Sequence, residues 1–259
     1  WGSITNVPPD LTNVISLSAG YAHNLAIRGE GTVRAWGDNS YHQIDVPAAL
    51  TNALTVAAGL YHSLALRNEG TVVGWGLSDQ GQADIPSTLG DVVSIAAGTY
   101  HSLALRKDGT VVGWGTTNTE TAVPSDLTNV VAIAAKDYNS LALKADGSVV
   151  GWGRSLTNPP ATLTNAVSIA CGSYHGLALL SDGTVVGWGG NDYGQATAPP
   201  GLSNVVAVTA GRYHSAALTA AGDVVAWGYP YGGQTTVPPN LREVVSITAG
   251  LYHTLALIG

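Results

Sequence analysis

Short apolar runs closed by glycine recur along the chain at nearly constant intervals. VVSIAAG (92–98) is rich in β-branched residues, YHSLALR (100–106) follows a tight turn, and TVVGWG (110–115) follows Asp108-Gly109. Runs of this length and composition predict strands, and Asp-Gly predicts the hairpin turn between two of them. Each unit therefore predicts three strands. A fourth, edge strand is expected where a polar loop ends in proline, as in QTTVPP (234–239).

Seven tryptophans mark seven copies of this unit. Most recur 38 or 39 residues apart, with two shorter intervals of 35 and 36, at Trp1, Trp36, Trp75, Trp114, Trp152, Trp188 and Trp227. Short strands in units of ~40 residues, repeated around an axis, are typical of a β-propeller. The sequence therefore predicts an all-β fold, namely a seven-bladed β-propeller of ~37–39-residue repeats. A single domain is expected over residues 1–259.

The composition of the strands fits blades that pack face to face. Both faces of each sheet would then be buried, so the strands would be continuous apolar runs. Only small residues fit where blades converge on an axis, which accounts for Ala57-Ala58-Gly59 and Ala96-Ala97-Gly98. Cys171 stands where other copies have alanine or a similarly small residue, and we expect it to be buried.

The two ends of the chain do not coincide with a repeat boundary. Trp1-Gly2 corresponds to the end of a third strand, and LYHTLALIG (251–259) ends a second strand. We expect residues 1–8 to complete the blade that residues 241–259 begin, which closes the ring and removes its open edges. Only two residues precede Ser3 and the chain has no methionine, so the original start is expected to lie upstream.

Composition excludes several classes of protein. Hydrophobic residues make up 45% of the chain and charged residues 10%, which excludes disorder. A single cysteine excludes a disulfide scaffold and a cysteine-rich zinc module. A net charge of −7 argues against nucleic acid as a partner. The apolar runs are too short for membrane insertion.

Sequence motifs of catalysis are absent. No glycine-rich phosphate loop opens a helix, and neither His-Glu-x-x-His nor Gly-x-Ser-x-Gly occurs. His-Ser neighbours such as His62-Ser63 would point to opposite faces of a strand, so they cannot form a dyad. We therefore expect no enzyme activity, no catalytic residues and no cofactor.

The repeated motif resembles a known family. Gly-x-Tyr-His-Ser-Leu-Ala-Leu, followed by Asp-Gly-Thr-Val-Val-Gly-Trp-Gly, is similar to the regulator of chromosome condensation repeat, most clearly over residues 58–76, 97–115, 171–189 and 249–259. Within that family, loops such as GGQTTVPP (232–239) are most similar to those of secreted bacterial propellers that inhibit β-lactamases. The resemblance implies a non-enzymatic propeller that binds another protein.

Aromatic residues favour one face of the predicted ring. Antiparallel strands place the turn between strands one and two, and the loop after strand three, on one face, here called the upper face. Links between blades and the turn between strands two and three lie on the lower face. All eleven tyrosines and all seven histidines fall in or beside upper-face loops. Tyrosine suits an interface because it combines a large apolar ring, a polar tip and few rotors.

Residues that change between copies are the best candidates for partner contact, because an asymmetric partner would contact each blade differently. Position x of Gly-x-Tyr changes chemistry from copy to copy, and loop residues vary as well. The candidate partner-binding residues are Tyr21, Tyr41, Leu60, Asp137, Arg154, Tyr193, Arg212, Tyr229, Tyr231 and Leu251. The tyrosines at the repeated position are scaffold or secondary contacts, and these are Tyr61, Tyr100, Tyr138, Tyr174, Tyr213 and Tyr252.

The recurring histidines are expected to be structural, with a ring nitrogen bonded to backbone near the turn. Rotation about a propeller axis would keep them too far apart to share a metal ion, so no metal site is expected.

The resulting hypothesis is a monomeric, extracellular or cell-surface bacterial propeller that binds another protein, in its narrowest form an inhibitor of a secreted hydrolase such as a β-lactamase. A carbohydrate-binding propeller, or an excised or engineered repeat protein, are the alternatives.

Overall fold

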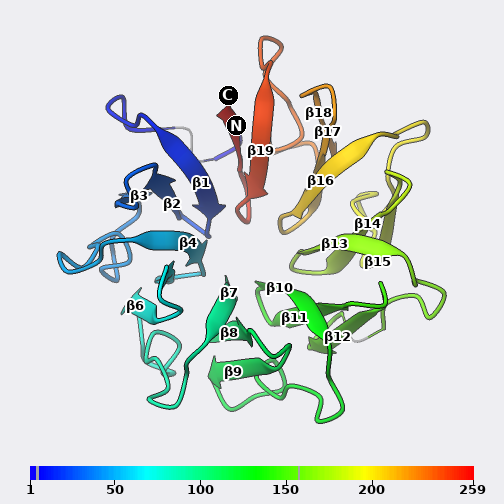
Figure 1. Ribbon diagram of the computed structural model, residues 1–259. Helices are drawn as coiled ribbons and strands as arrows, with labels where there is room; N and C mark the ends of the chain where they lie inside the picture. Colours follow the sequence, from blue (N-terminus) through cyan, green and yellow to red (C-terminus); the bar gives the residue numbers. More distant parts are fainter. Residues whose placement is uncertain (4–5, 157) are drawn as a thin grey trace.

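The computed structural model describes residues 1–3, 6–156 and 158–259, and those residues form seven small antiparallel sheets around a central channel (Figure 1). Six sheets have three strands, and the seventh has two strands extended by the N-terminus. We number the blades 1 to 7 in chain order. The prediction of an all-β, seven-bladed propeller is confirmed.

Each blade begins with the strand that lines the channel. These inner strands are β1 (Val14–Ala19), β4 (Ala53–Ala58), β7 (Val92–Ala97), β10 (Val130–Lys136), β13 (Ala166–Cys171), β16 (Val205–Ala210) and β19 (Val244–Ala249). The middle strands are β2 (His23–Arg28), β5 (His62–Arg67), β8 (His101–Arg106), β11 (Asn139–Lys144), β14 (His175–Leu180), β17 (His214–Thr219) and β20 (Thr254–Ile258). The outer strands are β3 (Val33–Gly37), β6 (Val72–Gly76), β9 (Val111–Gly115), β12 (Val149–Gly153), β15 (Val185–Gly189) and β18 (Val224–Gly228).

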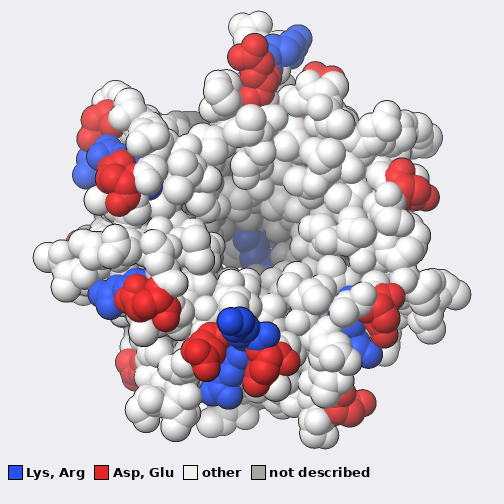
Figure 2. All heavy atoms as spheres, in the orientation of Figure 1, with Lys and Arg blue, Asp and Glu red and all other residues white. Residues whose placement is uncertain are grey.

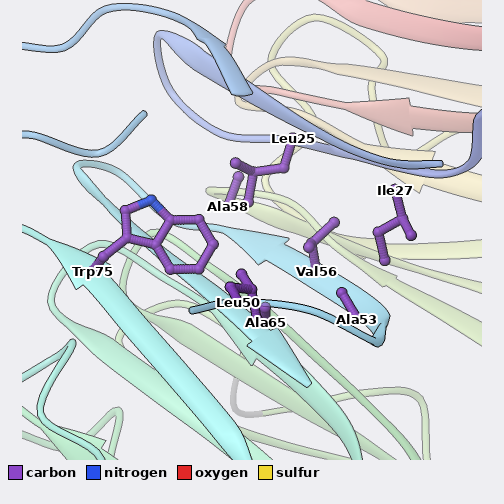
Figure 3. Packing of buried hydrophobic residues seen from close by; sticks show 8 residues of the cluster. All are labelled: Leu25, Ile27, Leu50, Ala53, Val56, Ala58, Ala65 and Trp75. Atoms are coloured by element: carbon purple, nitrogen blue, oxygen red, sulfur yellow. The ribbon is translucent and has the colours of Figure 1, made fainter. Parts of the chain in front are cut away.

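The hydrophobic core lies between blades. Leu25 of blade 1 and Val56, Ala65 and Trp75 of blade 2 belong to one buried cluster, so each sheet packs its face on the next (Figure 3). Five of the six residues in β5 are buried, as expected for a strand covered on both sides. Cys171 is buried, as predicted, and burial raises the pKa of its thiol to about 12. The thiol is therefore unreactive at neutral pH.

The inner strands depart from the expectation that both faces of every strand are buried. In each one the register shifts after the first residue, so the second residue is a bulge without a ladder partner. The bulge turns an aliphatic side chain to solvent in every blade, with exposed fractions between 48% and 58%. These residues are Ile15, Leu54, Val93, Val131, Val167, Val206 and Val245.

The predicted fourth strand is wrong for the described residues. The loop after each outer strand bonds within itself: Asp45 N donates to His42 O and Val46 N to Ile44 O, so these N–H groups are not available to a ladder. The proline that follows, Pro47, has no N–H to donate. The loop therefore packs beside the outer strand as a series of turns.

The predicted ring closure is present. Trp1 N donates to Thr254 O and Thr254 N donates to Trp1 O, both at 2.8 Å, and Gly2 bridges His253. The Trp1 indole Nε1 donates to Gln234 O at 2.8 Å, as Trp75 Nε1 does to Gln43 O in blade 2. Residues 1–3 thus act as the third strand of blade 7, and the N-terminal residues lie beside the beginning of β20, the last strand of the chain (Figure 1). Residues 4 and 5 of the predicted closing segment lie outside the described residues.

Blade 4 breaks the repeat with two substitutions that belong together. In blade 2, a Cβ atom on Gly59 would lie 2.3 Å from Cε1 of His62, so this glycine leaves room for the histidine ring. Blade 4 has Lys136 at the glycine position and the smaller Asn139 at the histidine position. Replacement of both residues avoids that clash. Asn139 Nδ2 instead donates to Ser173 O at 2.8 Å.

This pairing predicts energetic coupling in blade 2. Gly59→Ala alone is expected to destabilise the protein by about 2 kcal/mol, because the methyl group meets a buried ring. In a His62→Asn background the same change is expected to cost about 1 kcal/mol less. Chemical denaturation of the four members of this double-mutant cycle measures the coupling. Additive losses would contradict the steric explanation.

Candidate functional site

Turns between the inner and middle strands bring one residue of every blade to the mouth of the channel. In six of the seven blades the backbone N–H of position x in Gly-x-Tyr donates to a carbonyl of the next blade, for example from Leu60 to Gly98 at 3.1 Å and from Ser173 to Gly211 at 3.2 Å. These backbone bonds fix the spacing of the turns. They thereby fix where the x side chains lie.

The mouth of the channel is a cavity of about 440 Å³, which we call the mouth cavity. All seven x residues line it, and these are Tyr21, Leu60, Thr99, Asp137, Ser173, Arg212 and Leu251. Arg154, Tyr61, Tyr138 and Tyr174 complete much of the wall. The structure therefore brings together residues that the sequence spreads over more than two hundred positions.

Arg212 is held by tyrosines on three sides. Its Nη1 donates to the Tyr252 hydroxyl at 2.6 Å and its Nη2 to the Tyr174 hydroxyl at 3.4 Å. The guanidinium carbon also lies 5.4 Å from the centre of the Tyr213 ring. Both the hydrogen bonds and the cation–π contact reduce the freedom of this long side chain. Arg212 is thus preorganised at the edge of the mouth cavity.

Tyrosine rings contact one another along the upper face. Tyr174 stacks on Tyr213 with centroids 5.2 Å apart, and Tyr213, Tyr193, Tyr229 and Tyr231 continue the series. A second series joins Tyr41, Tyr61, Tyr21 and Tyr252, with centroid distances of 4.6, 5.8 and 6.1 Å. Arg212 contacts Tyr174, Tyr213 and Tyr252, so nine of the eleven tyrosines form one connected surface.

The other two tyrosines form a smaller group across the cavity. Tyr100 and Tyr138 have ring centroids 6.3 Å apart, and the Arg154 guanidinium lies 5.5 Å from the centre of the Tyr138 ring. Burial raises the pKa of the Tyr138 hydroxyl. The Tyr138 hydroxyl therefore stays protonated at neutral pH and can both donate and accept hydrogen bonds.

Exposure separates the candidate residues into two groups. Tyr231 is 85% exposed, Tyr193 45% and Tyr41 42%, whereas the tyrosines at the repeated position are half-buried. Leu251 is only 4% exposed, so it forms part of the cavity floor and offers little area to a partner. Partner binding by any of these residues stays a prediction.

The recurring histidines bond across blades, so the expected bond to backbone near the turn is wrong. Nε2 of His23, His62, His101 and His175 lies 2.7 to 3.0 Å from a serine hydroxyl of a later blade. That serine hydroxyl donates to a loop carbonyl, as Ser63 Oγ does to Gln43 O at 2.8 Å. The ring nitrogen must then be the donor, which defines the Nε2–H tautomer.

Burial dominates the electrostatics of these histidines. It lowers the pKa of His23, His101 and His175 to about 4, and that of His62, His214 and His253 to about 3. All six rings are 0% exposed. Each ring is bonded to a buried side chain of another blade, a hydroxyl group in five cases and Asn24 for His253, so these pairs join blades.

Two buried glutamines hold the upper-face loops in shape, and they were not identified from the sequence. Gln43 and Gln195 are almost completely buried, and their Oε1 atoms accept from the backbone N–H of Tyr41 and Tyr193. Their backbone carbonyls also accept from the serine and tryptophan of the next blade. The available signal was a glutamine at the same place in four of the loops, preceded by glycine in three of them. Gln43 and Gln195 position two of the exposed tyrosines.

Blade 5 lacks this arrangement where it meets blade 4. Leu156 stands in the loop where the other blades have glutamine or Glu120, and Gly176 replaces the serine. The indole Nε1 of Trp188 is accordingly buried without a partner. The departure in blade 4 therefore extends across its junction with blade 5.

Charged side chains gather around the rim of the lower face (Figure 2). Ion pairs there include Arg34–Asp10 at 3.2 Å and Lys144–Asp146 at 3.5 Å. The centre is hollowed into a second cavity of about 270 Å³, with Lys136 in its lining. Lys136 Nζ donates to Ala249 O at 2.6 Å, which joins blade 4 to blade 7 across the channel. Burial lowers the pKa of this ammonium to about 8.

The described residues contain neither a cluster of metal ligands nor a membrane-spanning helix. No group of three or more His, Cys, Asp or Glu side chains in residues 1–3, 6–156 and 158–259 has the geometry of a metal site. No helix in the same part of the chain is long and apolar enough to cross a membrane.

Fold and site together define a repeat propeller with one tyrosine-rich face. The family described as "Regulator of chromosome condensation (RCC1) repeat" matches residues 14–43, 54–82, 92–120, 130–156, 166–195 and 205–234, well over half of the chain. The chain belongs to this family. No functionally curated protein matches the sequence.

Solved structures similar to this chain share its fold at low identity. Human WBSCR16 is 21% identical with a TM-score of 0.77, covering 96% of this chain and 88% of its own. Prp20p from Saccharomyces cerevisiae, whose reported properties include binding to Gsp1p and histones, is 21% identical with a TM-score of 0.79, covering 96% and 83%. The ectodomain of the Physcomitrella patens receptor kinase CR4 is 21% identical with a TM-score of 0.81, covering 95% and 70%.

Proposed function

We propose that this chain is a non-enzymatic, protein-binding propeller whose upper face receives the partner. The observation that carries the proposal is the gathering of all eleven tyrosines on that face, nine of them in one connected surface around Arg212. Side chains already packed against one another lose little freedom when a partner binds. Prp20p, a structure with the same fold, is reported to bind other proteins. The partner of this chain is to be found by experiment.

The most exposed tyrosines provide the test. After a partner has been captured from the native source, Tyr231→Ala and Tyr193→Ala are each expected to weaken its binding roughly tenfold or more, as aromatic anchors do. Val206→Ala, which removes an exposed apolar side chain from the lower face, serves as the matched control. Equal affinity of all variants, measured by calorimetry, would place the interface elsewhere.

The narrower hypothesis is inhibition of a secreted hydrolase by occlusion. In this case the upper face would cover the active site of an enzyme such as a β-lactamase. A steady-state assay of β-lactam hydrolysis with increasing propeller concentration tests it directly. Loss of inhibition in Tyr231→Ala would tie the effect to the upper face, whereas an unchanged hydrolysis rate with wild-type protein would reject this form of the proposal.

Carbohydrate binding is the second candidate, because tyrosine rings and hydroxyl groups line the mouth cavity. Aromatic rings can stack on sugars while hydroxyl and guanidinium groups bond to them. A glycan array distinguishes the two classes of ligand. Binding of a defined glycan that Tyr174→Ala abolishes, without a protein partner, would replace the protein-binding proposal.

A further inference from the structure

We propose that the mouth cavity is a carboxylate subsite that takes an Asp or Glu side chain projecting from the partner protein. The inference rests on the proposed function and deepens it, because it specifies the chemistry of the partner. Its groups are Arg212, Arg154 and Ser173, all on the wall of one cavity.

Positive charge is unevenly distributed between the two faces. The chain has ten Lys and Arg residues and a net charge of −7. Seven of the ten lie at the lower ends of strands or in lower-face turns and links, and these are Arg28, Arg34, Arg67, Arg106, Lys107, Lys144 and Arg242. Lys136 lines the channel. The remaining two, Arg154 and Arg212, are the only Lys or Arg side chains of the upper face among the described residues, and both line the mouth cavity.

Unused hydrogen-bond donors point to an anionic ligand. Arg212 has five N–H groups, and its side chain makes two hydrogen bonds, one from each Nη, while its Nε has no partner. The Ser173 hydroxyl, on a residue only 2% exposed, also has no partner. Ser173 and Arg212 occupy the same repeat position in neighbouring blades, where Ser173 N donates to Gly211 O. A buried donor without a partner is costly, and a carboxylate is the acceptor that suits a guanidinium best.

The one carboxylate of the cavity wall is already engaged. Asp137 Oδ1 accepts from the Thr99 hydroxyl at 2.8 Å, and Asp137 follows Lys136 directly in the chain. The lining holds two guanidinium groups and this one carboxylate, so it carries a net positive charge. A cationic ligand would meet two like charges, whereas an anionic ligand would meet one.

The surroundings favour an acidic side chain on a protein over a free small anion. Tyr231 and Tyr41 are exposed on the same face, and Tyr61, Tyr138 and Tyr174 line the cavity wall itself. An acidic residue in the cavity would therefore be surrounded by an aromatic contact area. This arrangement matches a central charged anchor enclosed by packing that excludes water.

The test uses constrained peptides as the probe. A phage-displayed library of cyclic peptides is selected on the immobilised protein, and Asp and Glu are expected to be enriched at one position. A selected peptide is then synthesised with Glu and with Gln at that position, and the affinity of both forms is measured by calorimetry. The Glu form is expected to bind roughly tenfold to a hundredfold more tightly, as for a hydrogen bond between charged groups.

Three arginine variants assign the effect to the cavity. Arg212→Gln and Arg154→Gln are each expected to remove most of the preference for Glu over Gln. Arg242→Gln, an exposed arginine of the lower face, is the matched control and should leave the preference unchanged. Arg212 contacts tyrosines, so the thermal midpoint of each variant is measured as well. Arg154 is exposed and makes no ion pair with a described residue, which keeps the test valid if Arg212→Gln alters the fold.

Two outcomes overturn the inference. The first is a selection without Asp or Glu enrichment, including one that yields no binder. The second is a Glu preference that both upper-face arginine variants retain. Neither outcome contradicts the proposed function, which is protein binding by the upper face. If Tyr231→Ala weakens a natural partner while Arg212→Gln and Arg154→Gln do not, the upper face is the interface and the carboxylate subsite is wrong.

Discussion

Lowering the pH from 7 to 5 is expected to destabilise the protein by roughly 12 kcal/mol, which is about 2 kcal/mol for each of six buried histidines. Burial holds their pKa values at about 3 to 4, whereas an unfolded histidine titrates near 6.5. Between these values the unfolded chain binds protons that the folded chain does not. Stability is therefore fully present above pH 6.5 and decreases as the pH falls toward 4.

Urea denaturation across pH 4 to 8 measures this dependence, because its slope gives the difference in bound protons between the two states. Near pH 5 the slope is expected to approach six protons. His62→Asn should reduce this difference by about one proton, because asparagine does not titrate. Blade 4 already has an asparagine, Asn139, at this position. His42→Gln is the control, since the side chain of His42 is 83% exposed. A slope of one proton or less would show that the six rings are not buried and neutral.

Gly2→Val is expected to destabilise the protein by about 3 kcal/mol or more, because it prevents the N-terminal residues from completing blade 7. Gly2 has a φ of +102°, and a Cβ atom there would lie 2.4 Å from the carbonyl oxygen of Tyr252. The valine would displace the backbone bonds between Trp1 and Thr254 and the indole bond to Gln234. The open edges of blade 7 would then be exposed to solvent.

Gly90→Val is the matched control, because nothing lies within 4 Å of a Cβ atom at Gly90 and its φ is not in the left-handed region. Thermal unfolding and limited proteolysis of the N-terminus report the effect. Gly2→Val should lower the thermal midpoint and release residues near Trp1 to protease, while Gly90→Val should do neither. Equal midpoints for the two variants would mean that the closing segment contributes little to the ring.

Much of the fold could be predicted because short patterns of neighbouring residues define each repeat. The recurring Asp-Gly turns and β-branched runs define strands within about forty residues, and seven tryptophans count the blades. The offset of the two ends implied closure, which the bonds between Trp1 and Thr254 confirm. Two local expectations failed. Loop N–H groups bond within the loop in place of a fourth strand, and a bulge exposes one aliphatic residue per inner strand.

The candidate site was predictable in its residues but not in its arrangement. Alternating strand direction placed the tyrosines on one face, and variation at the x position selected the residues that line the mouth cavity. The pairing of Arg212 with Tyr174 and Tyr252 was not predictable, because these residues belong to three different blades. Nor was the role of Gln43 and Gln195, whose side chains shape the loops from inside.

The sequence by itself determined the blade number, the strand order, the small residues around the channel and the face that carries the aromatic residues. Each follows from a period or a turn type, and both are properties of neighbouring residues. The tertiary structure alone decided that His23 bonds to Ser63, forty residues away, that Lys136 crosses the channel to Ala249, and that two arginines share one cavity. These contacts depend on the closed ring, which brings together side chains that no local pattern relates.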